Sequence, residues 1–294
     1  MLLALGRASN LPTVWSNVLA AWLIGGGAWG AAAFPPLAWL LLGGSLLYLG
    51  GTTLNDAFDA EFDRKFRPSA RSRAYRISAR AVWALGIGYL IGGAVCWAIP
   101  GGAGWALTAA LVAAILLYDW IHKKNAAAGV PLMGACRLLL YAGSAAAALT
   151  GNAGGFTAPP AIWGIALAVY VCGLTIAARK ESTAGGDPDA IGRWPLILLF
   201  APAALWAALF AKADAPIYTA VFPALFLAWV MRGSWTLRDV PRGPGRIGAA
   251  VAQFLAGIAL FDAMAASLYN PGAAWFLLIA FPLALLAQRS IPAT

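Results

Sequence analysis

The sequence predicts an all-α polytopic membrane protein, and three of its features indicate this class. Hydrophobic residues make up 62% of the 294 positions, whereas charged residues make up only 11%; soluble domains carry roughly 25% charged residues. The mean hydropathy is +0.76 over the whole chain. Apolar runs of about 20 residues, which is the length that a helix needs to cross a bilayer, recur between short polar segments. One transmembrane domain is therefore expected over residues 1–294.

Ten candidate spans can be placed along the chain, and turn residues separate several of them. Pro35-Pro36, Pro100-Gly101-Gly102 and Asn270-Pro271-Gly272 interrupt the apolar pattern. Some spans are short, so we expect a bundle of nine or ten transmembrane helices. The predicted spans are 11–33, 37–56, 80–99, 103–121, 130–150, 159–179, 194–211, 216–231, 247–268 and 273–288.

The distribution of charge predicts the orientation in the membrane. The formal net charge is +9, but the cations lie at the ends of apolar spans, where they orient a membrane protein and face anionic lipid. We therefore expect contact with membrane lipid and no nucleic-acid partner. With the N-terminus in the cytoplasm, Lys212 is the one cation on an outer connection, and Arg137 lies inside a span. This asymmetry predicts a multi-pass protein of the inner membrane with a cytoplasmic N-terminus and a cytoplasmic polar cap.

Most of the candidate chemistry lies where the second span ends. Asp56, Asp59 and Asp63 recur at i, i+3 and i+7, so they share one helical face if the helix continues. Three carboxylates on one stripe repel one another unless a cation lies between them. Mg²⁺ takes oxygen ligands and usually bridges carboxylates to phosphate, and basic residues follow at once from Arg64 to Arg80. The spacing favours a metal–diphosphate site over the alternative, a solvated loop that only ends a helix.

A second acidic segment follows the sixth span. It contains Lys180 and Glu181 and then Asp187 and Asp189 on either side of a proline. The first acidic segment follows span two and this one follows span six. The offset of four helices suggests two related halves that present acidic helix ends to one shared cavity.

Four polar positions near or inside the spans have two readings each. Lys123 ends span four, where it either holds a diphosphate as a point charge or anchors the helix in lipid headgroups. Arg137 lies inside span five, and a buried arginine in a membrane normally faces a cavity or a partner, so we favour that role over snorkelling. Asp262 also lies inside a span, and we likewise favour a role in which it faces the cavity or a partner. Asn17 either lines the cavity or forms a hydrogen bond between helices.

These motifs resemble those of the UbiA superfamily of intramembrane prenyltransferases. The main one ends the second span and is followed by Arg67-Pro68. The segment from Ser9 to Asn17 resembles that family's opening helix. The motifs that carry the resemblance are Asn55-Asp56-x-x-Asp59-x-x-x-Asp63, Arg76-Ile77-Ser78 and Tyr118-x-Trp120-x-x-Lys123.

The resemblance implies a helical bundle with a polar cap over a lipid-accessible cavity. It also implies an enzyme in which Mg²⁺ is held on an isoprenyl diphosphate, and an allylic cation is captured by a lipophilic, aromatic acceptor. It gives catalytic roles to Asp56, Asp59, Asp63 and Asp187. The implied metal ligands are Asp56, Asp59, Asp63, Glu181 and Asp187; the implied diphosphate contacts are Asn55, Arg67, Lys123, Arg137 and Lys180; the implied substrate pocket includes Asn17 and Tyr118.

Two departures from the family pattern suggest a divergent member. The second acidic segment lacks aspartates at regular four-residue spacing, and the first loop reads Arg67-Pro68-Ser69-Ala70-Arg71-Ser72, without a second Arg-Pro. The UbiA-like EboC proteins are one branch that the chain resembles in this respect. The alternative function is therefore a non-catalytic carrier or scaffold for an amphiphilic natural-product precursor.

Overall fold

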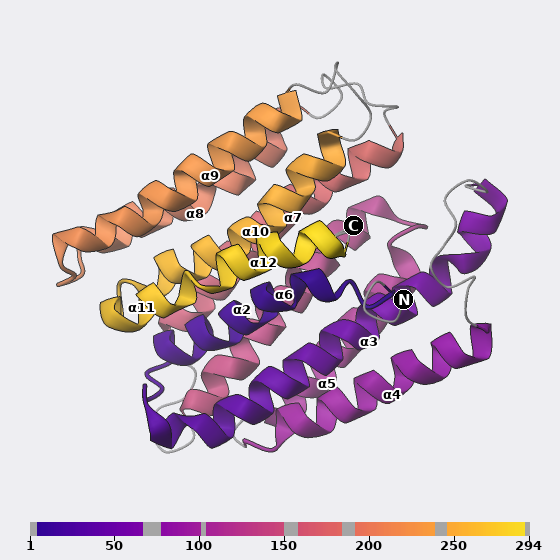
Figure 1. The fold of residues 1–294 in the computed structure, drawn as a ribbon, viewed down its shortest axis with the longest axis horizontal. Coiled ribbons are helices and arrows are strands. Elements are labelled where there is room, and N and C mark those ends of the chain that lie inside the picture. Colours follow the sequence, from indigo (N-terminus) through magenta and orange to yellow (C-terminus); the bar gives the residue numbers. More distant parts are fainter. Residues whose placement is uncertain are drawn as a thin grey trace.

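The structure is a computed structural model that describes residues 5–66, 78–100, 104–149, 158–183, 192–238 and 246–291. Only the backbone is described for residues 32, 61–66, 104, 158 and 180–183. Helices make up nearly all of these ranges, and they pack side by side as one bundle (Figure 1). The bundle confirms the all-α class predicted from hydropathy.

The helices have these bounds, in chain order: η1 (Ala8–Asn10), α2 (Leu11–Ile24), η2 (Ala31–Ala33), α3 (Phe34–Phe66), α4 (Ala79–Ala98), α5 (Gly104–Ile121), α6 (Ala126–Ala148), α7 (Ala158–Thr183), α8 (Trp194–Phe210), η5 (Ile217–Ala220), α9 (Val221–Arg238), α10 (Arg246–Ala266), α11 (Pro271–Leu277) and α12 (Ala280–Ser290).

Each of the ten predicted spans falls on a helix, which agrees with a polytopic membrane protein. Within the described ranges, seven helical segments are long and apolar enough to cross a bilayer, and α5 and α8 are shorter apolar helices. The predicted tenth span is divided, because α11 ends at Leu277 and α12 begins at Ala280. Large apolar side chains point outward along the bundle, among them Trp105, Trp194 and Ile217, which are 70%, 74% and 78% exposed. Such exposure suits a surface that faces lipid.

Two predicted boundaries are wrong. Span 11–33 ends early, since α2 stops at Ile24 before Gly25-Gly26-Gly27. There Gly26 takes a φ of 83°, and Trp22 Nε1 donates a hydrogen bond to the Ala28 carbonyl at 2.8 Å. Span 37–56 ends late, since α3 continues to Phe66. No glycine or proline interrupts the helix between Thr52 and Phe66, so the acidic stripe is helical throughout.

Side-chain caps start three of the helices at the predicted turns. Ser78 accepts a hydrogen bond from the Ala81 amide at the start of α4. Asn125 and Asn270 do the same at the starts of α6 and α11. Each cap satisfies an amide that has no partner within its own helix. The Asn125 cap is important for the site, because it begins α6 directly after the turn that contains His122 and Lys123.

Glycines let α3 and α4 approach each other closely. A Cβ atom on Gly93 would lie 2.7 Å from the backbone nitrogen of Leu47, and one on Gly43 would lie 2.7 Å from that of Trp97. Larger residues at these positions would push the helices apart. Small residues at such crossings are typical of helix pairs in membranes, where association depends on close packing rather than on the hydrophobic effect.

Helix α10 lies at the centre of the bundle. It packs against α2, α7 and α9, and residues 256–266 are buried without interruption. Most of these residues are small or apolar, as expected for a helix that is surrounded by protein on all sides. Asp262 is the exception, because it is a fully buried carboxylate in the middle of this stretch.

Candidate functional site

A cavity of about 710 Å³ lies among α2, α3, α5, α6, α7 and α10. Its volume is in the range typical of small-molecule sites. Most of its wall is apolar, and the polar residues cluster where α3, α5 and α7 end. We call this region the polar end of the cavity and define it by Arg7, Asn55, Asp59, Asp119, His122, Lys123 and Arg179. The apolar wall includes Val14, Leu47, Leu111, Ile115, Leu140, Val171, Leu174, Val251, Leu255 and Ile258.

Asp59 lies between the His122 imidazole and the Lys123 ammonium group at the polar end. Its Oδ1 atom is 3.4 Å from His122 Nε2, and its Oδ2 atom is 3.3 Å from Lys123 Nζ. The residue is only 8% exposed. A buried carboxylate loses several kcal/mol of hydration, and a pair of opposite charges at about 4 Å recovers about 4 kcal/mol at an effective dielectric constant of about 20. The two neighbours therefore make a buried, charged Asp59 tolerable.

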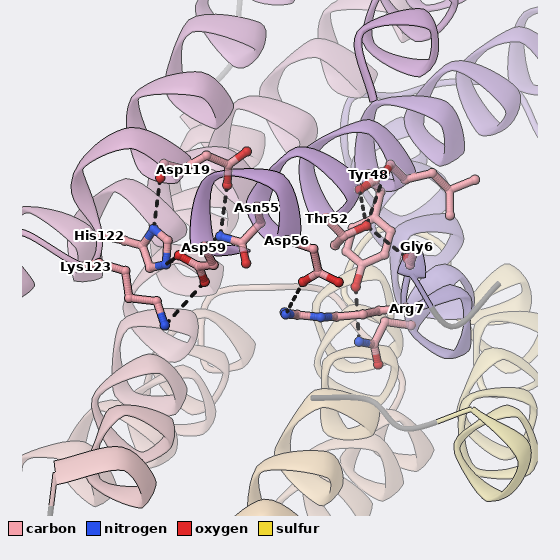
Figure 2. A network of polar contacts seen from close by, with 12 residues as sticks. Gly6, Arg7, Tyr48, Thr52, Asn55, Asp56, Asp59, Asp119, His122 and Lys123 are labelled. Atoms are coloured by element: carbon pink, nitrogen blue, oxygen red, sulfur yellow. Dashed lines mark hydrogen bonds and ion pairs between the residues drawn. The ribbon is translucent and has the colours of Figure 1, made fainter. Parts of the chain in front are cut away.

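Asp56 points toward a different partner from Asp59. Its Oδ1 atom accepts a hydrogen bond from Arg7 Nη2 at 3.4 Å, and Figure 2 shows the two carboxylates directed toward separate groups of side chains. Arg7 lies just before η1 in a left-handed backbone conformation with φ 45°, which is uncommon for a residue other than glycine. The Thr52 hydroxyl donates a hydrogen bond to the Gly6 carbonyl at 3.0 Å, which fixes this segment on α3.

Asn55 joins α3 to α5. Its Nδ2 atom donates a hydrogen bond to Asp119 Oδ1 at 3.2 Å and lies 3.5 Å from His122 Nε2. Asp119 is 4% exposed, and its Oδ2 atom has no hydrogen-bond partner in the described part of the chain. A buried carboxylate oxygen without a partner is rare in native proteins. Because Asp119 lines the cavity, this oxygen is a candidate contact for a bound cation or a polar ligand group.

The turn after α5 is held in place by its neighbours. The His122 ring stacks on Tyr118 with centroids 4.8 Å apart, and its Nδ1 atom lies 3.0 Å from the Tyr118 carbonyl. Arg179 Nη1, on the last turns of α7, donates a hydrogen bond to the His122 carbonyl at 2.9 Å. Gly129 permits α6 to pass close by, since a Cβ atom there would lie 3.0 Å from His122 Cα. His122 is therefore positioned from three helices.

Arg137 lines the cavity away from the acidic motif. Its guanidinium donates to the Asn17 amide oxygen at 2.6 Å and to the Thr13 carbonyl and hydroxyl at 3.3 and 3.1 Å. Asn17 in turn donates to Asp262 Oδ2 at 2.7 Å. Asn17 and Asp262 do not line the cavity; they lie behind the guanidinium. Tyr118, the other predicted pocket residue, does line the cavity.

Several predicted site residues have no described side chain. The helix α3 continues through Asp63, so the backbone of the whole stripe is helical as expected. Lys180 and Glu181 fall on the last turn of α7, directly after Arg179, which lines the cavity. Arg67 and Asp187 lie outside the described residues. The roles of these five residues stay predictions.

Four residues that the fold brings to this site were not predicted from the sequence: Arg7, Asp119, His122 and Arg179. Arg7 comes from the segment before the first helix, and Asp119 and His122 end an apolar span. Their spacing of three residues at the end of an apolar span was a usable signal, because it places both on one helix face. No sequence pattern connected Arg7 with Asp56.

The described side chains do not form a complete Mg²⁺ site in the absence of a bound substrate. Among the described side chains, no three His, Cys, Asp or Glu residues are close enough to hold a metal ion by themselves. Mg²⁺ commonly uses one or two carboxylates together with waters and substrate phosphates. Asp59 and Asp119 line the cavity, and Asp119 Oδ2 has no partner among the described residues, whereas Asp56 is turned toward Arg7 and is not part of the cavity wall. The residues therefore fit a magnesium ion that arrives with a phosphorylated ligand.

Solved structures resemble this chain in fold, whereas comparisons of its sequence identify no relative. No family model matches the chain, and no curated protein sequence matches it closely enough to identify a relative. A UbiA homologue from Aeropyrum pernix K1 without ligand has a TM-score of 0.67 at 16% identity, over 87% of this chain and 96% of that one. A UbiA homologue from Archaeoglobus fulgidus, bound to DMAPP and Mg²⁺, has a TM-score of 0.52 at 19% identity, over 88% and 98% of the two chains.

A third similar structure comes from work on digeranylgeranylglyceryl phosphate synthase in membranes. It has a TM-score of 0.57 at 17% identity and covers 99% of this chain and 97% of that one. The likeness to all three extends over nearly the full length of each chain, so it concerns the whole bundle and not one local motif. The resemblance first indicated by the acidic stripe is thus matched in three dimensions, and the chain has the fold of the UbiA homologues.

Proposed function

We propose that this chain is a divergent UbiA-superfamily prenyltransferase. It transfers an isoprenyl group from an isoprenyl diphosphate to a lipophilic, aromatic acceptor within the membrane, with Mg²⁺ as cofactor. The observation that carries the proposal is the position of the acidic motif. Asn55 and Asp59 lie at the polar end of a large apolar cavity, in a bundle with the fold of UbiA homologues, one of which was solved with DMAPP and Mg²⁺.

The acidic side chains would hold the metal. Five residues are expected as ligands. The structure describes the side chains of Asp56 and Asp59, and Asp63, Glu181 and Asp187 are expected from the sequence alone. A magnesium ion would neutralise the leaving diphosphate. Asp59 contacts His122 and Lys123, and this supports the proposal, because both side chains could donate hydrogen bonds to a diphosphate bound beside the carboxylate.

The basic side chains of the polar end would bind the diphosphate oxygens. Lys123 and Arg179 line the cavity, and Arg7 lines it on the other side of the motif. Arg67 and Lys180 are expected to join them. When the C1–O bond of the donor breaks, its electron pair leaves with the diphosphate. Fixed positive groups at that position stabilise the developing negative charge more than mobile water would.

The apolar wall would hold the isoprenyl chain and exclude water. Leucine, isoleucine and valine side chains from several helices face the cavity, and they offer no oxygen that could capture an allylic cation. The acceptor would then form the new bond with C1 and release a proton. Exclusion of water matters here, because hydrolysis of the cation is the competing reaction.

The orientation follows from the same site. We infer that the polar end faces the cytoplasm, the compartment in which soluble diphosphates and Mg²⁺ are supplied. The proposed location is the inner membrane with a cytoplasmic N-terminus, and the positive-inside asymmetry supports it.

One observation favours the alternative, a non-catalytic carrier or scaffold for an amphiphilic anion. The described carboxylates Asp56 and Asp59 are already paired with Arg7, His122 and Lys123, so the fold does not need a metal to compensate them. A carrier would retain function when the second acidic segment is neutralised. An enzyme that uses Glu181 and Asp187 as metal ligands would lose most of its rate.

The test uses the purified full-length chain in detergent with a panel of isoprenyl diphosphates from geranyl upward. Release of diphosphate and prenylation of co-purified lipid are measured with Mg²⁺ and with EDTA. The enzyme hypothesis expects Mg²⁺-dependent turnover that is lost in the Glu181→Gln and Asp187→Asn variants. Binding of a diphosphate without any turnover, unchanged in both variants, would support the carrier. If no isoprenyl diphosphate binds at all, both forms of the proposal are wrong.

A further inference from the structure

A chain of polar contacts crosses the bundle behind Arg137. The Asn17 amide oxygen accepts from Arg137 Nη1 at 2.6 Å, and the Asn17 amide nitrogen donates to Asp262 Oδ2 at 2.7 Å. The Ser16 hydroxyl donates to the same oxygen at 2.6 Å. Asn17 and Ser16 are fully buried, as is Asp262. A guanidinium and a carboxyl group are thus joined through one amide in the middle of the bundle.

This network lies deeper than the acidic motif. Arg137 lies over the ring of Tyr48, with 5.8 Å from Cζ to the ring centroid. Tyr48 precedes Asp59 by eleven residues on α3, which corresponds to about 16 Å along the helix axis. The arginine side chain leans back toward the start of its own helix, but its bonds to Thr13 and Asn17 hold the guanidinium at this depth.

The guanidinium still has hydrogen-bonding capacity toward the cavity. It has five N–H groups, and the bonds to Thr13 and Asn17 account for three of them. Arg137 also forms part of the cavity wall. A ligand group deep in the cavity can therefore receive a hydrogen bond from it without breaking its contacts to α2.

The charge of this arginine is compensated from behind. Asp262 is fully buried and lies one amide away, since Asn17 bonds to both side chains, and as a carboxylate it would offset the charge of the guanidinium. A buried pair of this kind has little net charge, so it attracts a second anion weakly. It remains a good hydrogen-bond donor, because the donors are fixed and lie in a medium of low dielectric constant. The polar end is different, because Arg7, Lys123 and Arg179 gather there around the acids.

We propose that Arg137 forms a second polar subsite, separate from the acidic motif, which binds an uncharged oxygen of the lipophilic acceptor, such as a hydroxyl or carbonyl group. Asp262 is the positioning residue that sets the charge of this subsite through Asn17. The proposal rests on the proposed function and deepens it. It also replaces the sequence-based expectation that Arg137 contacts the diphosphate, since the diphosphate would lie at Asp59.

The test measures ligand binding by the purified full-length chain, and it needs no knowledge of the true acceptor. The acceptor probes are 1-naphthol, which is uncharged at neutral pH, and 1-naphthoate, which is an anion of similar shape. The donor probe is geranyl thiolodiphosphate, which does not react, together with Mg²⁺. The variants are Arg137→Gln, Asp262→Asn and the double variant, with the exposed Asp214→Asn as the charge-matched control.

The wild type and Asp214→Asn are expected to prefer naphthol over naphthoate by roughly tenfold, the effect of one good hydrogen bond. Asp262→Asn leaves Arg137 uncompensated, so the preference should reverse toward naphthoate. The double variant removes both buried charges, and it should bind both probes weakly and without preference. It also keeps the test valid if the unpaired charge prevents Asp262→Asn from folding, because removing both partners is better tolerated than removing one.

Two results would overturn the subsite. One is equal naphthol binding by the wild type and the double variant. The other is loss of geranyl thiolodiphosphate binding in Arg137→Gln with naphthol binding unchanged, which would make Arg137 a diphosphate contact. Naphthol selectivity that follows these expectations while the thiolodiphosphate never binds would support the subsite and count against the prenyltransferase itself.

Discussion

His122 Nε2 lies 3.4 Å from Asp59 Oδ1, and this contact joins the turn after α5 to the acidic motif of α3. The imidazole is itself fixed by Tyr118, on which it stacks. A carboxylate in the middle of the motif is thus oriented by a residue from another helix. Side chains that orient metal-binding carboxylates influence affinity nearly as much as the ligands do.

Replacing Asp59 by asparagine should weaken Mg²⁺-dependent binding of geranyl thiolodiphosphate by about tenfold or more, because a charged oxygen ligand is lost and Lys123 no longer contacts a carboxylate at this position. Isothermal titration with and without Mg²⁺ measures this. Asp214→Asn removes a carboxylate from an exposed loop and should bind like the wild type. Equal affinities in the two variants would exclude Asp59 from the site.

Replacing His122 by glutamine should weaken the same binding by roughly 10-fold to 100-fold, the usual effect of losing a partner that orients a ligand. The fold should persist, since the turn is also held by the Arg179 hydrogen bond to the residue 122 carbonyl. Lys124→Gln, on an exposed neighbour in the same turn, is the matched control. A His122→Gln variant with wild-type affinity but a lower melting temperature would show that the histidine is only structural.

Replacing Asp119 by asparagine should raise the free energy of unfolding by about 1–2 kcal/mol, because the variant buries a neutral amide in place of a carboxyl group with an oxygen that lacks a hydrogen-bond partner. The Asn55 hydrogen bond survives, since an amide oxygen can accept it. Diphosphate binding should fall at the same time, a common trade-off at functional sites. Thermal unfolding in detergent and the titration above test the two parts. A lower melting temperature would mean that the carboxylate is well solvated or paired in the native state.

Replacing Gly93 by alanine should destabilise the α3–α4 pair by about 1–3 kcal/mol, because the added methyl group would meet the backbone of Leu47. The matched control lies on the same helix: Gly88 has open space around it. Gly88→Ala should be neutral or slightly stabilising, since alanine favours helix formation over glycine by about 1 kcal/mol. Similar melting temperatures for the two variants would contradict the close helix crossing.

The fold was predictable because hydropathy and turn residues act locally. The run from Phe34 to Leu54 is apolar and therefore helical in a membrane, and Pro271 marks the start of α11 as expected. The predicted ends of spans 11–33 and 37–56 were wrong because no proline or other strong helix-breaking residue marks them. The end of α2 depended on a glycine with positive φ, and α3 ran past the predicted boundary because charged residues are compatible with a helix.

The candidate site was predictable only along α3. Asn55, Asp56 and Asp59 lie on one helix, so their spacing alone brought them into one group. The sequence could not predict that Asp56 and Asp59 contact different side chains, because their partners Arg7 and His122 lie far away in the sequence. Arg137 was rightly singled out as a cavity residue by the cost of burying a cation in a membrane. For Asn17 the sequence left two possibilities, and the structure shows the hydrogen bond between helices rather than a place on the cavity wall.

By itself, the sequence determined a polytopic helical bundle and an acidic helix end followed by cations. These properties follow from hydropathy and from helical periodicity, which are settled within a few turns of the chain. Only the tertiary structure decided that Asp59 meets His122, that Asp56 meets Arg7, and that Asp262 reaches Arg137 through Asn17. Such pairings depend on which helices pack together. A polar side chain needs a specific partner only once the packing has removed water from around both side chains.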